Sequence, residues 1–358
     1  NEEAYKIFKE KIGCEIVVTD HHQVPVDNYP HTADAFINPM REDSTFVKDI
    51  SGCATAFLLM VKVHQLMFKN KNINFFKDVL PFVAISTIGD VMSLKHTINR
   101  YFIKIGLNEL NTYGNNKLWI ALKKTLGVPG IFTVKDIGYK LGPLINTGNR
   151  LGVEELVYEL LTTTDYYIAM SKADELNKLN AFRKNTTKNL MGKVKDKIIQ
   201  NQYTNSVVVT IETDIAVNGI IAASISDTNK VPTVCFIDNG DREIVAGSSR
   251  SPVMGPDIVA VFKDIYENSK DILIGYGGHS GAAGCSININ KIEEFRELFD
   301  RYCYIHSMSI DRTPYIDIDV ILEDKYITPD FINKINNVGP YGKDWSEPVF
   351  LSVLTVGY

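Results

Sequence analysis

Short, continuous apolar runs that each end in polar residues are the strongest constraint on how this chain can fold. The first run, residues 15–19, is β-branched and leads directly into Asp20, His21 and His22. An apolar run of this length is typical of a strand buried on both faces of a parallel sheet. Ligands of open α/β sheets gather at the carboxyl ends of such strands, so this polar triplet is the first candidate site.

A second set of such runs follows further along the chain, which predicts a second α/β unit. Between the two sets, residues 153–200 show helical periodicity with few breakers and predict a connecting arm. A third piece begins near Pro314, where residues 315–321 alternate like a half-buried strand. Helices are expected at residues 2–11, 51–68, 75–88, 97–111, 117–126, 135–141, 219–226, 258–266 and 292–302, and further strands at residues 206–211, 233–237 and 243–246.

Composition and charge exclude several classes of protein. The 358 residues suffice for two or three domains, and no apolar run approaches the roughly 20 residues that a membrane span needs. The five scattered cysteines form no CxxC pair, which indicates free thiols in a reducing cytosol and excludes a zinc ribbon. The polar N-terminus carries no signal peptide and no initiator Met, so we expect processing or truncation.

The net charge of −5 does not indicate a nucleic-acid-binding protein, but the charges are unevenly distributed. Residues 178–197 carry seven Lys or Arg residues against a single acid. This stretch is either a surface that follows the phosphates of a nucleic acid or the solvated face of a helix.

The triplet Asp20-His21-His22 could contribute to a metal site. Adjacent side chains on an extended segment point to opposite sides, so the two histidines are expected to play different roles. One could ligate a metal while the other faces substrate, and Asp20 would be a ligand or an orienting partner. His pairs are also common in surface loops, so the triplet alone is weak evidence.

Asp90 is the second candidate. It follows the apolar run of residues 79–85, so we expect it to be buried, and a buried acid must be paired or bind a cation. An ordinary exposed helix end is the alternative. If the carboxylate faces His21, oxygen and imidazole ligands together suit Mn²⁺ best, with Mg²⁺ as the second choice.

Three glycine-rich segments could bind phosphate. In the expected loop of residues 142–150, Asn146 and Arg150 suit a phosphate, although Arg150 could instead pair with Glu154. Small residues surround His279 in residues 277–284, which could form either an anion-binding nest or a tight turn between strands. Residues 247–251, with Arg250, are a further phosphate-binding candidate.

These segments occur in an order that resembles the DHH superfamily of phosphoesterases. Asp20-His21-His22 resembles the motif that names the superfamily, and residues 88–94 are similar to its Ala-Asp-Val-Val-Pro-Leu stretch. Residues 51–57 resemble the small-residue helix start between them, and residues 278–284 resemble the GGHxxAAG element of the DHHA1 domain.

Two further segments favour the RecJ family of single-strand-specific DNA exonucleases within that superfamily. Residues 142–150 are similar to its GPxxNxxxR stretch, and residues 340–350 are similar to the PFG…PEPVF stretch of its oligonucleotide-binding (OB) domain. The resemblance covers nearly the whole chain.

The resemblance implies an α/β fold with four parts. An incomplete, parallel-sheet DHH domain would be joined by a long helical connector to a smaller α/β DHHA1 domain, followed by the start of an OB-type β domain. The expected boundaries are residues 1–150, 151–202, 203–308 and 309–358.

The resemblance also implies roles for single residues. His21 and Asp90 would ligate Mn²⁺ or Mg²⁺, with two ions in the complete protein, while Asp20 ligates or orients and His22 contacts the scissile phosphate. The expected nucleic-acid-binding residues are Asn146 and Arg150 on the DNA backbone, Arg250, Gly278 and His279 at the terminal nucleotide, and Lys184 and Lys188 along the strand.

The implied reaction is 5′-to-3′ hydrolysis of single-stranded DNA to mononucleotides. Its expected setting is DNA repair and recombination in the cytoplasm, without membrane association. A single-strand-binding protein and a helicase are the candidate protein partners.

Several departures from the family pattern bear on activity. The family's earlier motifs, an Asp-rich segment and a bridging Asp, lie upstream of the DHH triplet, and residues 1–19 are too short to hold them. A two-metal site needs several carboxylates to hold ions roughly 3.5 to 4 Å apart. We therefore expect a fragment of a longer protein that is weakly active or inactive by itself. Cys53, Thr147 and Asn149 replace smaller residues, and Ser249 stands where Gly is common.

Two other functions stay open. A DHH phosphodiesterase acting on nanoRNA, adenosine 3′,5′-bisphosphate or a cyclic dinucleotide would usually lack the GPxxNxxxR stretch and the OB portion. A non-catalytic nucleic-acid-binding relative would usually have lost the DHH residues.

Overall fold

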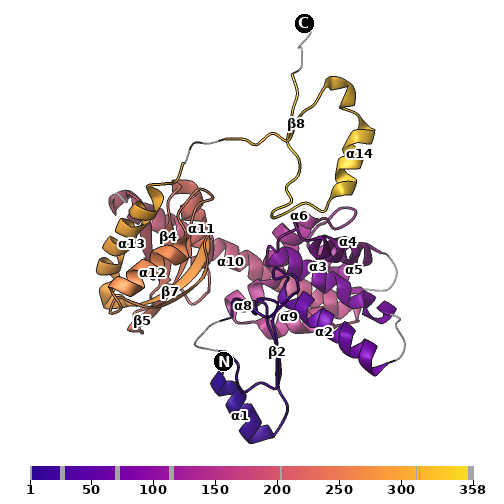
Figure 1. The fold of residues 1–358 in the computed structure, drawn as a ribbon, viewed down its shortest axis with the longest axis horizontal. Coiled ribbons are helices and arrows are strands. Elements are labelled where there is room, and N and C mark those ends of the chain that lie inside the picture. Colours follow the sequence, from indigo (N-terminus) through magenta and orange to yellow (C-terminus); the bar gives the residue numbers. More distant parts are fainter. Residues whose placement is uncertain are drawn as a thin grey trace. The chain divides into compact units, whose positions relative to one another are not determined.

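The computed structural model describes residues 2–24, 29–68, 73–112, 117–201, 204–311, 313 and 315–353, without the side chains of residues 73–75, 197 and 199–201. The chain divides into two compact units, each discontinuous in sequence (Figure 1). Unit 1 comprises residues 1–144, 160–173 and 316–358, and unit 2 comprises residues 145–159 and 174–315.

Unit 1 begins with helix α1 (Glu2–Ile12) and a two-stranded parallel sheet. Strand β1 (Val17–Thr19) pairs in parallel with β2 (Ala35–Ile37). The expectation that β1 is buried on both faces is wrong, because Val17 is 56% exposed. Among the described residues, β2 is the one strand that pairs with β1.

A 3₁₀-helix and several α-helices contribute to the core of unit 1. Ser51 caps the first of them, because its side-chain oxygen accepts a hydrogen bond from the backbone N–H of Ala54. The expected helix over residues 75–88 is a 3₁₀-helix followed by an α-helix, and Pro81 lies in the first turn of the α-helix, where it is tolerated. The bounds are α2 (Gly52–Met67), η2 (Ile73–Val79), α3 (Leu80–Gly89), α4 (Thr97–Asn111) and α5 (Lys117–Thr125).

Helices α3 and α4 pack closely through a glycine. A methyl group on Gly106 of α4 would lie 2.5 Å from Cβ of Ala84 and closer still to the carbonyl oxygen of Leu80, both on α3. Val83 and Phe102 are buried beside this contact. The packing therefore fixes α3, and with it the helix end at which Asp90 lies.

The expected loop over residues 142–150 is wrong, because this segment is helical. A π-helix runs directly into two short α-helices, so Pro143 lies within a continuous helical run, just after the π-helix. The connecting arm is interrupted at residues 163–165, where the Asp165 carboxylate accepts hydrogen bonds from the backbone N–H groups of Tyr167 and Ile168. The elements are α6 (Val134–Asp136), η3 (Ile137–Leu141), α7 (Gly142–Ile145), α8 (Thr147–Leu151), α9 (Glu154–Thr162) and α10 (Tyr166–Asn201).

The described part of unit 2 contains a mixed five-stranded sheet in the order β3-β4-β5-β7-β6. β3 and β4 are parallel and the other neighbours are antiparallel. Three α-helices and a 3₁₀-helix lie between or after its strands in sequence. The bounds are β3 (Val207–Ile211), α11 (Asn218–Asn229), β4 (Thr233–Ile237), β5 (Ile244–Arg250), α12 (Ile258–Asn268), β6 (Leu273–His279), β7 (Ala282–Asn288), η4 (Ile289–Lys291) and α13 (Ile292–Ser307).

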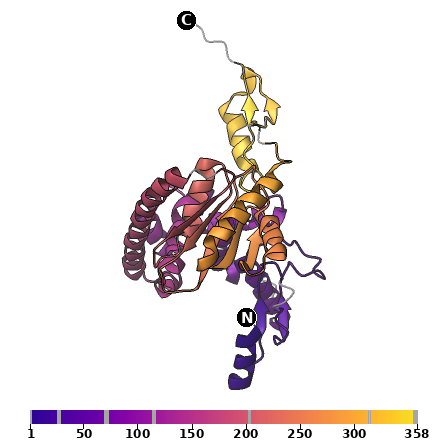
Figure 2. The same ribbon diagram turned by 90° about the vertical axis from the view of Figure 1, so that its left-hand side faces the viewer.

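Helices cover both faces of this sheet (Figure 2). Val208, Val234 and Phe236 pack against α12 and α13 on one face. Cys235 and the alternate residues of β3 pack against α11 and the end of α10 on the other. The alternation follows from the two-residue period of a strand, and it makes unit 2 a three-layered α/β/α sandwich. The predicted α/β class is confirmed.

Residues 316–353 form a small part of unit 1. The strand expected at residues 315–321 is mostly wrong, because only β8 (Val320–Ile321) pairs, with the equally short β9 (Phe350–Leu351). The 3₁₀-helix η5 (Asp324–Tyr326) and helix α14 (Pro329–Val338) lie between these two strands in sequence. Among the described residues, no helix has the length and apolar character needed to cross a membrane. All five cysteines are free.

Candidate metal and phosphate sites

His21 and Asp90, 69 positions apart in sequence, lie together in unit 1. His21 follows β1, and Asp90 is the residue at which α3 ends. The His21 Nε2 and Asp90 Oδ2 atoms are 4.0 Å apart. Gly52, the first residue of α2, leaves room for the imidazole, because a methyl group there would lie 3.2 Å from His21 Cδ2.

Asp90 is not buried, contrary to expectation. Its side chain is 43% exposed, whereas that of His21 is 17% exposed. The apolar residues before Asp90 are buried against neighbouring helices, but the helix ends there and its last residues reach the surface. Ser86 donates a hydrogen bond to Asp90 Oδ2 over 3.3 Å.

Asp20 orients His22. Its Oδ1 atom lies 2.8 Å from His22 Nδ1 and also accepts hydrogen bonds from the backbone N–H groups of His21 and His22. Burial is the largest single influence on the pKa of Asp20 and raises it, but the hydrogen bonds from His22 and from the two backbone groups outweigh it. The pKa is therefore below its ordinary value.

The two histidines do not point to opposite sides. Their ring centroids are 4.4 Å apart and the rings are tilted by 51°. The expectation failed because β1 ends at Thr19, so the alternation of an extended strand no longer holds at residues 21 and 22. Their environments still differ, since the side chain of His22 is 73% exposed.

His21 and Asp90 fit a single divalent cation as two of its ligands. One imidazole nitrogen and one carboxylate oxygen 4.0 Å apart can both reach an ion placed between them, and this donor set suits Mn²⁺ or Mg²⁺. No group of three or more His, Cys, Asp or Glu residues that could hold a metal occurs in the described part of the chain. Cys53 lies near this pair, and burial first, then the charge of Asp90, raises the pKa of its thiol.

Arg150 belongs to unit 2 and contacts the N-terminal side of α11. Its guanidinium donates to the carbonyl oxygen of Ala216 over 2.6 Å, rather than pairing with Glu154. Asn146 is the N-cap residue of α8, and its side chain makes no capping hydrogen bond.

Arg250 approaches the same helix from β5. It donates to the side-chain oxygen of Ser248 over 3.0 Å and to the carbonyl oxygen of Ser249 over 2.7 Å. A methyl group on Gly219, in the first turn of α11, would lie 3.0 Å from both Arg250 Nη2 and the Ser248 oxygen. The glycine thus lets the guanidinium lie against the start of the helix.

Arg183 of α10 is a residue that the sequence did not single out. It is only 7% exposed, and its guanidinium bonds to Asn180 Oδ1 over 2.7 and 3.2 Å. Burial, and next the charge of Arg150, lowers the pKa of Arg183, and the same two causes lower the pKa of Arg250. Burial also lowers the pKa of Arg150.

These three residues, Arg150, Arg183 and Arg250, form an arginine cluster. Within the described residues all their hydrogen-bond partners are neutral, and none forms an ion pair with a carboxylate. Partly buried positive charges are costly unless an anion compensates them, so the cluster is suited to bind one.

Gly278 and His279 lie at the end of β6, in a hairpin that turns at residues 280–281 into β7. Gly278 has a φ of 143°, and a methyl group there would lie 2.6 Å from the carbonyl oxygen of Ala282. The backbone therefore requires glycine at this position for structural reasons alone. His279 is exposed.

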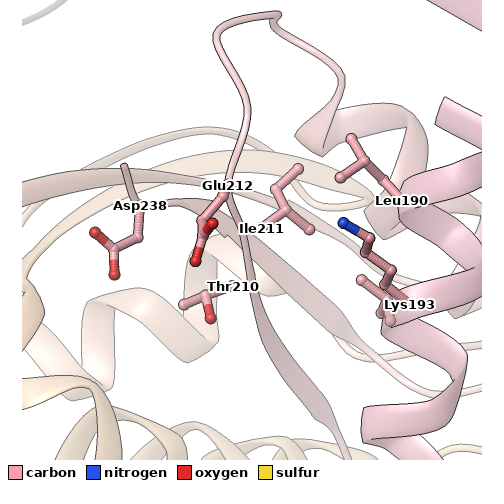
Figure 3. A pocket seen from close by; sticks show the side chains of 7 residues that line it. Leu190, Lys193, Thr210, Ile211, Glu212 and Asp238 are labelled. Carbon is pink, nitrogen blue, oxygen red and sulfur yellow. The ribbon is translucent and has the colours of Figure 1, made fainter. Parts of the chain in front are cut away.

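The lysine-rich stretch lies on α10. Lys184 and Lys188 are exposed, in contrast to Arg183 beside them. One turn further, Lys193 extends into a pocket of about 210 Å³ toward Glu212 and Asp238, at the carboxyl ends of β3 and β4 (Figure 3). The acids offset part of the positive charge at that end of the stretch.

Comparisons with known proteins identify several relatives of this chain. Residues 200–304 match the DHHA1 domain family. The chain is 25% identical to the single-stranded-DNA-specific exonuclease RecJ of Bacillus subtilis over 340 residues, covering 94% of this chain and 41% of that protein. It is 28% identical to the RecJ of Haemophilus influenzae over 357 residues, covering 96% of this chain and 61% of that protein.

The chain thus resembles RecJ proteins along most of its length, and residues 200–304 within it match the DHHA1 family. Two crystal structures of RecJ from Thermus thermophilus share its fold. The complex with Mg²⁺ has a TM-score of 0.74 at 24% identity, covering 94% of this chain and 49% of that chain. The complex with Mn²⁺ has a TM-score of 0.76 at 23% identity, covering 98% and 50%. The RecJ-like chain thus spans between about two fifths and three fifths of these relatives.

The unit boundaries do not follow the four expected parts, because residues 160–173 and 316–358 both count with unit 1. The DHHA1 match over residues 200–304 overlaps the expected residues 203–308. The domain boundaries stay a prediction, as do the roles of the individual site residues.

Proposed function

We propose that this chain provides the metal- and phosphate-binding parts of a metal-dependent exonuclease that degrades single-stranded DNA from 5′ to 3′. The observation that carries the proposal is the 4.0 Å separation of His21 Nε2 and Asp90 Oδ2. The names of the RecJ relatives support exonuclease activity on single-stranded DNA.

His21 and Asp90 would hold Mn²⁺ or Mg²⁺, the ions in the Thermus thermophilus complexes. When bound, two such ions would supply an activated water and neutralise charge on the phosphate. Two protein donors cannot hold two ions firmly, so the chain alone is expected to be weakly active or inactive. With Nδ1–H of His22 donated to the Asp20 carboxylate, the exposed His22 side chain would present its other ring nitrogen, Nε2, to the scissile phosphate.

The arginine cluster would bind phosphate groups of the strand. A phosphate there would compensate the partly buried charges of Arg150, Arg183 and Arg250, whose present partners are neutral. Around it, Asn146, Gly278 and His279 would add contacts to the backbone or terminal nucleotide. Lys184 and Lys188 would attract the strand electrostatically, so binding should weaken with salt.

The cellular setting belongs to the same proposal. DNA repair and recombination in the cytoplasm fit the single-strand exonuclease reaction, with a single-strand-binding protein and a helicase as partners. The free cysteines agree with a reducing compartment.

The test measures binding and cleavage together. The chain and Mn²⁺ are incubated with one of three substrates: a 5′-phosphorylated single strand, a duplex of the same sequence, or a dinucleotide. Binding of the single strand is followed separately by fluorescence anisotropy at several salt concentrations. We expect salt-sensitive binding of the single strand, and any Mn²⁺-dependent release of mononucleotides should be slow and abolished by Asp90→Asn. Preferred cleavage of the dinucleotide would favour the small-substrate alternative, and unchanged cleavage by Asp90→Asn would refute the proposal.

A further inference from the structure

The turn of residues 90–96, which joins α3 to α4, carries Asp90 in a strained backbone. Val91 has a φ of 53°, in the left-handed region that a β-branched residue rarely adopts. Such a conformation persists only where the surrounding structure holds it. The position of the Asp90 carboxylate therefore depends on whatever holds this turn.

One side of the turn is held from within the helical core. The backbone N–H of Ser93 donates to Asp49 Oδ2 over 2.9 Å. The side-chain amide of Asn99, in α4, donates to the carbonyl oxygens of Ser93 over 2.9 Å and Asp49 over 2.7 Å. These contacts fix the middle of the turn to α4 and to the segment before α2.

The other side is held by residues 342–345, about 250 positions later in the sequence (Figure 1). The backbone N–H of Leu94 donates to the carbonyl oxygen of Lys343 over 2.8 Å. Leu94 is 3% exposed, and a methyl group on Gly342 would lie 2.9 Å from its Cδ1 atom. The glycine thus allows the late segment to lie directly on Leu94.

Arg100 and Trp345 complete this contact. The guanidinium of Arg100 lies over the Trp345 ring, with 4.4 Å between Cζ and the ring centroid. The same guanidinium donates to the carbonyl oxygens of Leu94 and of Lys95, the latter over 3.1 Å. Both backbone groups of Leu94 are thus engaged by side chains or backbone outside the turn.

We propose that residues 342–345 are a positioning element for Asp90: by clamping the turn at Leu94, they hold the carboxylate where it can share a cation with His21. Trp345 acts through Arg100 and does not touch the metal. The inference rests on the proposed function, because it presumes a cation between His21 and Asp90. If the clamp is loosened, the strained turn relaxes and the carboxylate leaves its 4.0 Å position.

The experiment measures Mn²⁺ occupancy beside the turn without relying on activity. The chain is labelled with methionine that carries ¹³C in its methyl group, and the Met92 signal, assigned with Met92→Leu, is followed as Mn²⁺ broadens it. Trp345→Ala should raise the Mn²⁺ concentration for half-broadening by about two- to fivefold or more, the factor expected for losing a half-buried cation–π contact. Trp345→Phe should restore most of the affinity, because the phenyl ring can still stack on Arg100.

Two controls separate this role from simple stability. Tyr326→Ala removes an aromatic ring from the same C-terminal part without touching the turn, and it should bind Mn²⁺ like the unmodified chain. Asp90→Asn should abolish the broadening. If Trp345→Ala binds like the unmodified chain while Asp90→Asn does not bind, the positioning role is refuted and the proposed function stands. If Mn²⁺ does not broaden the Met92 signal in the unmodified chain or in any variant, the proposed function and the positioning role are both refuted.

Discussion

Replacing Gly106 by Ala tests the packing that places α3 and therefore Asp90. The added methyl group would lie 2.5 Å from Cβ of Ala84 and even closer to the carbonyl oxygen of Leu80. Favourable contacts between carbon atoms lie at about 3.5–4.0 Å, so the two helices would have to separate by about 1 Å. Neither neighbour can rotate away, because one is a backbone atom and the other a Cβ.

Two opposing effects set the magnitude. Ala is favoured over Gly inside a helix by about 1 kcal/mol, which would stabilise Gly106→Ala. Overpacking costs about 1–3 kcal/mol, and the rigid neighbours place this site at the upper end. We expect a net loss of about 2 kcal/mol in the free energy of unfolding of unit 1, or a Tm lowered by roughly 4–8 °C.

Both tryptophans of the chain, Trp119 and Trp345, belong to unit 1, so urea unfolding followed by tryptophan fluorescence reports on that unit alone. Gly89→Ala is the matched control, because a methyl group on Gly89, at the end of α3, meets no atom within 4 Å. That variant should be as stable as the unmodified chain or slightly more so. Equal stability of Gly106→Ala and Gly89→Ala would refute the close packing of α3 against α4.

Three further predictions concern the remaining sites. Arg183→Met should leave the Tm unchanged or raise it, because the change removes a buried charge that has no anionic partner. The same variant should bind single-stranded DNA about tenfold or more weakly, as measured by fluorescence anisotropy. A clearly lowered Tm would instead show that Arg183 has a structural role. Gly278→Ala should lower the Tm of unit 2 in calorimetry, because the added methyl group clashes with the facing strand of the hairpin. His279→Ala should leave that Tm unchanged, because His279 is exposed. The hydrogen bond from Lys140 is the largest of the causes that lower the pKa of Asp136 below its ordinary value of 3.8. The stability that the ionised Asp136 contributes is therefore present above pH 3.8 and is lost as pH falls through the lower pKa of the folded state. Asp136→Asn should make the Tm fall less steeply at acid pH, and an unchanged dependence of Tm on pH would contradict this.

Elements with strong local signals could be predicted from the sequence. The helix over residues 97–111 and the strand over residues 233–237 have the predicted bounds, because apolar periodicity and burial agree there. Residues 142–150 misled the prediction, because Gly and Pro usually mark loops. Here Pro143 lies inside a helical run, directly after the π-helix η3, where the backbone already departs from regular α-helical hydrogen bonding.

The sites were predictable only in part. The DHH triplet and Asp90 stand out by residue type, but the exposure of Asp90 depends on where α3 ends relative to its neighbours. Arg183 could not be told from the lysines around it, because only the fold buries it and brings it near Arg150. Likewise, nothing local connects Trp345 with Arg100, which are in contact through tertiary structure alone.

The most direct measurement is a double-mutant cycle on Mn²⁺ affinity, read from the electron paramagnetic resonance signal of free Mn²⁺. His21→Ala, Asp90→Asn and the double variant are compared with the unmodified chain. If the two side chains share one cation, each single change removes most of the binding and the double variant is hardly weaker than either. Independent, additive losses, or full affinity in either single variant, would contradict a shared ion between His21 and Asp90.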